Sequence, residues 1–251
     1  DGLIVAGGDG TFQGMRPFEK QIKVIGVPKT IDNDLSGTDL TFGFDTACSV
    51  VAEALDSLRA TAEAHHRVIV VETMGRTAGW IALGGGLAGY ADAILIPEKP
   101  FVRDALKRFL VTEKARGRRG LVIAVSEGAF AQGESPKVAF VVKGSPQQER
   151  YGGVSYDLSR WIESVSEWES RHVVLGHLQR AKHPTTTDRF LTLSMGVEVV
   201  KMVEEEAWGK AVVYRHGKLE RAPVSDLMQP PRLVSLTHPW VEMAATVGVF
   251  I

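Results

Sequence analysis

The chain has 251 residues, of which 44% are hydrophobic and 24% are charged, so it is long enough for one large or two modest domains around an apolar core. Its formal net charge is -1 and it has no long single-sign run, which argues against a nucleic-acid or membrane surface as the main partner. The single cysteine, Cys48, excludes an internal disulfide and predicts a small buried core residue in a reducing, cytoplasmic setting.

Short apolar runs without polar alternation recur along the chain and are typical of strands buried on both faces of a parallel sheet. They lie at residues 3–6, 24–27, 68–71, 93–96 and 121–125. Helical periodicity between and after these runs predicts helices over residues 45–64, 102–114 and 188–206. Strands that alternate with helices predict an α/β fold with mostly parallel sheets.

Two regions carry less regular patterns. Residues 131–153 are rich in glycine, proline and polar residues around one apolar run, residues 138–142, and therefore predict a loop with an edge strand. In the last helical stretch, Phe190, Leu193, Val197 and Val200 share one face.

The first chemical motif is Gly7-Gly8-Asp9-Gly10-Thr11, directly after a predicted strand and before a helical segment. Backbone N–H groups at such a position can receive phosphate, because glycine lets the backbone approach closely. Asp9 would supply a carboxylate for a magnesium ion that bridges phosphate oxygens. The alternative is an ordinary tight turn. Several kinase families share the motif, so it predicts a class of ligand rather than a substrate.

The second motif is Pro28-Lys29-Thr30-Ile31-Asp32-Asn33-Asp34, after the strand at residues 24–27. Of two carboxylates two residues apart, one can face a substrate hydroxyl while the other binds a metal or orients the loop. An Asx-rich turn would explain Asn33 and Asp34, but not the whole string.

These two motifs, together with Thr73-Met74-Gly75-Arg76 and Gly176-His177-Leu178-Gln179-Arg180, closely resemble the phosphofructokinase family in order and approximate spacing. The resemblance covers nearly the whole chain. It implies a 6-phosphofructokinase, a glycolytic transferase that uses Mg²⁺ and moves a phosphoryl group to the 1-hydroxyl of fructose 6-phosphate, giving fructose 1,6-bisphosphate. A lipid or NAD kinase would not require the second and last motifs.

The resemblance also implies two Rossmann-like three-layer subdomains. The phosphoryl-donor side would comprise about 1–43 plus 181–230, and the fructose 6-phosphate side about 44–180 plus 231–251. The chain begins as if inside a strand, so we expect it to be N-terminally incomplete, without the family's opening strand and glycine loop. A catalytically incomplete fragment that only binds sugar phosphate is therefore an alternative.

Roles follow by resemblance, position by position. Asp32 would be the general base, beside Thr30 and Asp34. The glycine loop would bind the nucleotide through Gly7, Gly8, Asp9, Gly10 and Thr11. Asp9 would also bind Mg²⁺. Met74, Gly75 and Arg76 would contact fructose 6-phosphate, with Arg76 and Thr30 counted as catalytic beside Asp32. Glu127 would bind sugar hydroxyls, and Arg171, His177 and Arg180 would hold the 6-phosphate.

Arg67 matches an arginine that the family supplies across a subunit boundary, so the resemblance implies a homo-oligomer, a tetramer or a dimer. Without the family context, Arg67 and Arg171 would be ordinary surface charges, His177 a structural histidine and Glu127 a strand-end acid. Arg59, Glu98, Arg116 and Arg118 fall where bacterial members place an effector site, and a solvated basic loop explains them equally well.

The motifs depart from the family pattern in ways that concern the phosphoryl donor. Gly10 leaves room for a nucleotide and favours ATP, whereas Lys29 accompanies pyrophosphate use in many relatives. We expect ATP, with a pyrophosphate-dependent enzyme as the alternative. After Arg180, Ala181, Lys182 and His183 replace the family's usual glycine pair, which predicts a modest change in the loop of the 6-phosphate site.

Overall fold

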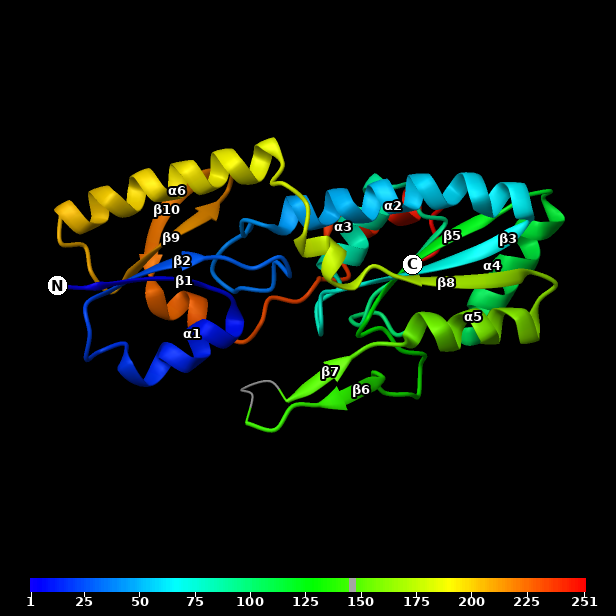
Figure 1. Ribbon diagram of the computed structural model, residues 1–251, viewed down its shortest axis with the longest axis horizontal. Helices are drawn as coiled ribbons and strands as arrows, with labels where there is room; N and C mark the ends of the chain where they lie inside the picture. The colour runs from blue at the N-terminus through cyan, green and yellow to red at the C-terminus, as the bar shows by residue number, and fades with distance from the viewer. Residues whose placement is uncertain (145–147) are drawn as a thin grey trace. The chain divides into compact units, whose positions relative to one another are not determined.

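The computed structural model describes residues 1–144 and 148–251. The chain divides into two compact units, each with a sheet of its own (Figure 1). The first unit contains residues 1–46 and 183–232. The second contains residues 47–144, 148–182 and 233–251.

The first unit is built on a four-stranded sheet with the order β1-β2-β9-β10. β1 pairs parallel with β2 and β2 pairs parallel with β9, whereas β9 and β10 form an antiparallel hairpin. Its elements are β1 (Leu3–Gly7), α1 (Asp9–Met15), η1 (Arg16–Phe18), β2 (Val24–Pro28), α6 (Thr186–Glu204), β9 (Lys210–Arg215), β10 (Lys218–Pro223) and η3 (Val224–Met228).

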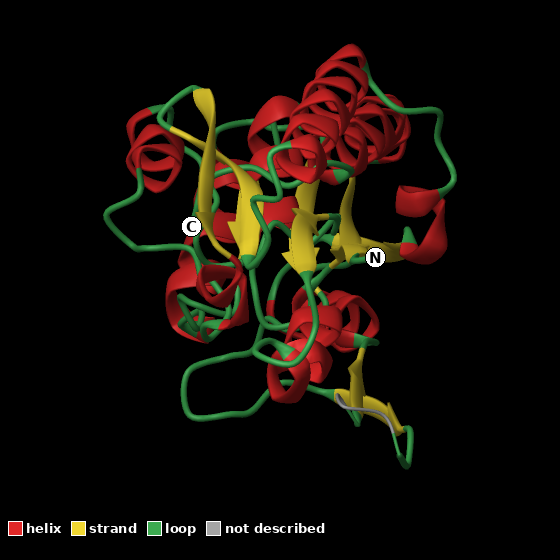
Figure 2. Cartoon of the chain, turned by 90° about the vertical axis from the view of Figure 1, so that its left-hand side faces the viewer, coloured by secondary structure: helices red, strands yellow, loops and turns green. Residues whose placement is uncertain are grey.

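Helices cover both faces of this sheet, as Figures 1 and 2 show. Because successive side chains of a strand point to opposite faces, Val24 of β2 packs with α1 and η3 while its neighbour Ile25 packs with α6. The central strand β2 is buried along its whole length. Its carboxyl end therefore has little freedom, which matters for the loop that follows it.

The second unit is built on a four-stranded parallel sheet with the order β4-β5-β3-β8. Helix α2 begins in the last residues of the first unit and runs into the second. The elements are α2 (Phe44–His65), β3 (Arg67–Thr73), α3 (Trp80–Ala88), β4 (Ala93–Leu95), α4 (Arg103–Ala115), β5 (Leu121–Ser126), β6 (Val138–Val141), β7 (Glu149–Tyr151), α5 (Val154–Val165), β8 (Glu169–Val174), η2 (Gly176–Arg180) and α7 (Pro239–Thr246).

The second sheet also lies between helical layers. α4 and α5 pack their apolar residues against one face, and α2 and α3 lie over the other (Figure 1). α3 packs closely on α2 at Gly85, where a Cβ would come 2.5 Å from Cβ of Val51. All residues of β4 and β5 are buried. This three-layer arrangement confirms the predicted α/β class with mostly parallel sheets.

Two expectations drawn from apolar patterns are wrong. β1 lies at the edge of its sheet, with Leu3 48% and Ile4 52% exposed, so it is not buried on both faces. Cys48 is only partly buried on α2. In α6, Phe190 and Leu193 share a face as predicted; that face is exposed, and the opposite face packs on the sheet.

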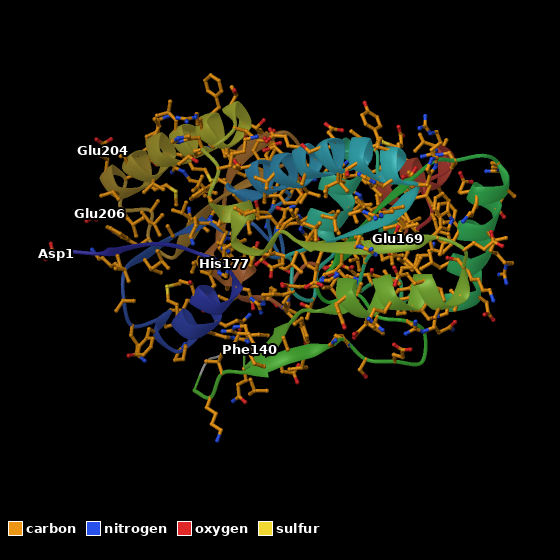
Figure 3. The ribbon with its side chains drawn as sticks, turned by 45° about the vertical axis from the view of Figure 1, so that its right-hand side comes forward. Asp1, Phe140, Glu169, His177, Glu204 and Glu206 are labelled. Carbon is orange, nitrogen blue, oxygen red and sulfur yellow. The ribbon has the colours of Figure 1, made fainter. Side chains whose placement is uncertain are left out.

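The glycine-rich stretch contains a two-stranded antiparallel hairpin, β6 and β7. The predicted edge strand at residues 138–142 corresponds to β6, whose residues are exposed; Phe140 is labelled in Figure 3. Residues 145–147 of that stretch lie outside the described residues. Within the described ranges, no helix is both long and apolar enough to cross a membrane.

Candidate active site

Two of the sequence motifs meet at the carboxyl ends of neighbouring strands in the first unit. β1 and β2 are paired in parallel, with Gly7 opposite Pro28, so the loops that follow them start side by side. The backbone N–H of Lys29 donates to the carbonyl oxygen of Gly7 at 2.8 Å. A Cβ on Gly8 would lie 3.1 Å from Cβ of Thr30, so glycine is what permits this approach.

The glycine loop leads into the short helix α1. Gly7 packs tightly on the first turn, because a Cβ there would lie 2.4 Å from Cβ of Thr11. The Asp9 carboxylate begins the helix and accepts a hydrogen bond from Nε2 of Gln13 at 3.3 Å. The side chain of Gln13 also donates to the carbonyl oxygen of Met228 at 3.0 Å, which ties α1 to η3.

The loop after β2 holds its carboxylates in a buried position. Asp32 is 6% exposed and Asp34 3% exposed. The hydroxyl oxygen of Thr30 accepts from the backbone N–H of Asp32 at 3.1 Å, which turns the chain sharply between them. Asn33 has a left-handed backbone with φ of 53°, a conformation that asparagine tolerates better than most residues. Thr30, Asp32 and Asp34 therefore lie in one compact loop.

In the second unit, Met74, Gly75, Arg76 and Glu127 are also brought together. They follow β3 and β5, which are parallel neighbours with Thr73 opposite Ser126. The backbone N–H of Arg76 donates to Oε1 of Glu127 at 2.9 Å. Gly75 has φ of 132°, and a Cβ on Gly128 would lie 2.0 Å from the carbonyl oxygen of Arg76.

The fourth motif joins the same end of this sheet through Gln179. β8 is the other parallel neighbour of β3, and η2 follows it with His177 and Arg180 exposed. The Gln179 side chain is 1% exposed; its Oε1 accepts from the N–H of Met74 at 3.3 Å and its Nε2 donates to the carbonyl oxygen of Gly176 at 3.1 Å. Figure 3 shows His177 on this segment.

Arg67 and Arg171 are not brought to these loops. Arg67 opens β3, so it lies roughly 20 Å along the strand from Met74, because a strand rises about 3.3 Å per residue. Nε of Arg67 contacts Oε2 of Glu169 at 2.8 Å, and Arg171 contacts both Glu169 and Glu163. Glu169, labelled in Figure 3, has its carboxyl pKa lowered chiefly by the hydrogen bond from Arg67. Arg171 therefore does not join His177 and Arg180 within one chain.

The residues considered for an effector site separate into different places. Arg59 and Arg118 both contact the carboxylate of Asp92, while Arg116 pairs with Glu113 on α4. Glu98 belongs elsewhere: its carboxylate accepts from the backbone N–H groups of Gly79 and Val234, and burial raises its pKa. Asp92, which the sequence did not single out, is the acid that these arginines contact.

Two further buried polar residues hold the starts of helices, without any signal in the motifs. Glu72, at the end of β3, accepts from the N–H groups of Gly153 and Ser155 and from the Ser155 hydroxyl at 2.7 Å. Asp188 accepts from the N–H groups of Gly43 and Thr46. Both are carboxylates at helix N-termini, where the helix dipole favours a negative charge.

Comparison with known proteins bears on this arrangement of loops. A sequence model described as phosphofructokinase matches residues 1–203. The chain belongs to the phosphofructokinase family. The predicted family and the predicted enzyme class, a phosphotransferase, are therefore confirmed.

Curated relatives and solved structures agree with this family. The chain is 39% identical over 251 residues to ATP-dependent 6-phosphofructokinase 2 of Clostridium perfringens, covering 99% of the chain and 69% of that protein. It is 43% identical over 227 residues to a pyrophosphate–fructose 6-phosphate 1-phosphotransferase of Amycolatopsis mediterranei, covering 90% of the chain and 66% of that protein. A phosphofructokinase structure from Saccharomyces cerevisiae matches with a TM-score of 0.76 and 29% identity, covering 90% of this chain and 32% of that one.

Proposed function

We propose that this chain is the catalytic region of a 6-phosphofructokinase that transfers a phosphoryl group from ATP to the 1-hydroxyl of fructose 6-phosphate. The observation that carries the proposal is the position of Asp32, in a buried loop directly beside the glycine loop of Gly8. Phosphoryl transfer depends mainly on positioning and on neutralising charge, with one residue to accept the hydroxyl proton. The first unit would then be the phosphoryl-donor side and the second the fructose 6-phosphate side.

In this mechanism Asp32 accepts the proton of the sugar 1-hydroxyl, and Thr30 and Asp34 orient it. The N–H groups of residues 7–11 bind the phosphates of the donor. Arg76 of the second unit would stabilise the charge that spreads over the oxygens of the transferred phosphoryl group, as a guanidinium can.

The residues present fit a magnesium ion, because Mg²⁺ commonly takes one or two carboxylates and several phosphate or water oxygens. Asp9, at the start of α1 directly after the glycine loop, would supply that carboxylate. Across residues 1–144 and 148–251, no cluster of three or more His, Cys, Asp or Glu side chains is found. When bound, the ion neutralises charge on the phosphates of the donor.

The acceptor would be bound by loops of the second unit. Glu127 would accept hydrogen bonds from sugar hydroxyls, beside Met74 and Gly75, and the exposed side chains of His177 and Arg180 would hold the 6-phosphate. Arg67 and Arg171 reach a sugar phosphate only if a second subunit presents them, so the proposal includes a homo-oligomer, a tetramer or a dimer. A cytoplasmic location stays a prediction.

The donor has a second candidate, because one relative is named for pyrophosphate and another for ATP. Gly10 favours ATP, since an aspartate there would crowd a nucleotide. Lys29 is exposed beside the glycine loop and favours pyrophosphate. We give ATP preference because a lysine side chain does not fill the nucleotide position as a carboxylate at residue 10 would.

The test is formation of fructose 1,6-bisphosphate by the purified chain with Mg²⁺, with ATP and pyrophosphate in parallel. The variant Asp32→Ser should lose about 10²- to 10⁴-fold in kcat with little change in fructose 6-phosphate binding, as expected for loss of a general base. Asp56→Ser, at an exposed aspartate of α2, is the matched control. Equal kcat in both variants would remove Asp32 from the mechanism. Sugar binding without product from either donor would favour a non-catalytic binding module.

A further inference from the structure

A half-buried arginine far along the chain, Arg232, contacts the loop that carries Asp32. Nη2 of Arg232 donates to the carbonyl oxygen of Asn33 at 2.9 Å and to that of Asp39 at 3.0 Å, which lie 199 and 193 residues earlier in the sequence. The backbone N–H of Arg232 donates to the carbonyl oxygen of Asp34 at 2.7 Å. The two ends of the segment that follows Asp32, residues 33–34 and residue 39, are therefore held by one residue.

The loop has further internal bonds at the same points. Oδ1 of Asn33 accepts from the N–H of Thr41 at 2.9 Å, and Nδ2 of Asn33 donates to the carbonyl oxygen of Asp39 at 3.3 Å. The Thr41 hydroxyl donates to the carbonyl oxygen of Thr30 at 2.7 Å. Residues 30 and 41 are thus joined. The bonds of Asn33 hold it in its left-handed conformation, which costs free energy and persists only where the surroundings impose it.

We infer that Arg232 is a positioning residue for the proposed reaction: it fixes residues 33–39 so that the carboxylate of Asp32 points at the substrate hydroxyl. This inference rests on the proposed function, in which Asp32 is the general base. Proton abstraction needs the base within hydrogen-bond reach of its proton, and a misplacement of about 1 Å can cost about 10²-fold in rate.

The charge of Arg232 suits this role. Burial lowers its pKa, and the nearby carboxylates of Asp39 and Asp34 act in the opposite direction. A guanidinium remains protonated near neutral pH even so, because it is too basic to lose its proton in a protein. The cation therefore stays a donor to the two carbonyl oxygens, whereas a neutral side chain of the same size would leave the carbonyl of Asn33 without this donor.

One nitrogen of Arg232, Nη2, donates to the carbonyl oxygens of both Asn33 and Asp39, so two variants at this position can test the inference. Arg232→Met keeps the length of the side chain but removes the donor, while Arg232→Lys keeps one nitrogen that can donate to both carbonyls. Arg221→Met is the matched control, because Arg221 belongs to the same unit but contacts Glu198 and Glu205, outside the site. All are compared by kcat, by KM for fructose 6-phosphate and by the midpoint of unfolding.

We expect R232M to lose about 10- to 100-fold in kcat, with KM for fructose 6-phosphate within about 2-fold of wild type. R232K should recover most of the lost kcat, and R221M should keep wild-type kcat. Unchanged kcat in R232M, or equal losses in R232M and R232K, overturns the inference while leaving the proposed function standing. If R232M does not fold, Arg232→Gln decides: its shorter side chain cannot reach both carbonyl oxygens as Nη2 of Arg232 does, and an unchanged kcat there overturns the inference. A wild-type chain that forms no product with either donor overturns both.

Discussion

Replacing Asp188 should destabilise the first unit more than any surface change. Its carboxylate is 2% exposed and accepts from the N–H of Gly43 at 2.7 Å, from the N–H of Thr46 at 2.8 Å and from the Thr46 hydroxyl. Its own backbone N–H donates to Oγ1 of Thr185, the N-cap of α6, at 3.3 Å. One residue thus connects the starts of α2 and α6, which are distant in sequence.

The size of the effect follows from what each substitution leaves behind. Asp188→Ala leaves two backbone N–H groups and a hydroxyl without their acceptor, and each such buried group costs about 1–3 kcal/mol. Because these losses are not additive and some water enters, we expect about 3–5 kcal/mol in the free energy of unfolding. Asp188→Asn keeps one acceptor oxygen but turns an NH₂ group toward a donor, and should cost about 2–3 kcal/mol.

Urea denaturation of wild type, D188N and D188A measures this directly, with Asp157→Ala as the control. Asp157 pairs with Lys137 while 55% exposed, and surface ion pairs contribute about 0–1 kcal/mol. If D188A unfolded within about 1 kcal/mol of wild type, the carboxylate would not hold the two helices, and the reasoning from buried hydrogen bonds would be refuted.

Two further predictions concern the second unit. Burial raises the pKa of Glu98 above its ordinary value of 4.5, so between the unfolded and the folded pKa only the folded state keeps the proton. The contribution of Glu98 to stability is therefore greatest below the unfolded pKa and is lost as pH rises through the folded pKa. Glu98→Gln should remove this part of the pH dependence in urea midpoints measured from pH 4 to 7, and parallel curves for the two proteins would contradict it. Gln179→Met removes the two hydrogen bonds that connect Met74 to Gly176. Because one to two hydrogen bonds are lost, KM for fructose 6-phosphate should rise about 10-fold, and KM for the donor should not change. The exposed Gln132→Met serves as its control, and equal KM values in the two variants would show that Gln179 positions nothing.

Local patterns were sufficient for much of the fold. All five predicted buried runs are strands, and the predicted helices at residues 45–64, 102–114 and 188–206 correspond to α2, α4 and α6. An apolar run of strand length or a 3.6-residue period depends only on neighbouring residues, so it can be recognised without knowing the fold. The same holds for the glycine loop and the loop of Asp32, whose chemistry lies in consecutive residues.

Other elements carry no such pattern. β8 and β10 contain charged residues and no apolar run of strand length. Each is the edge strand of its sheet, where a strand need not be buried on both faces. In α6 both faces are apolar, and only packing on β2 and β9 decides that Leu191 and Met195 are buried while Phe190 is exposed. Periodicity identifies a helix in such a sequence but does not select its buried side.

By itself, the sequence determined the α/β class, the family and the loops that we propose for catalysis, because each of these is encoded in residues close together along the chain. Only the tertiary structure decided that Asp188 connects two helix starts, that Gln179 joins two motifs and that Arg232 holds the loop of Asp32. These are pairings of buried or half-buried polar groups across about 100 to 200 residues. A buried donor needs an acceptor, but which acceptor lies within hydrogen-bond distance is settled only when the chain has folded.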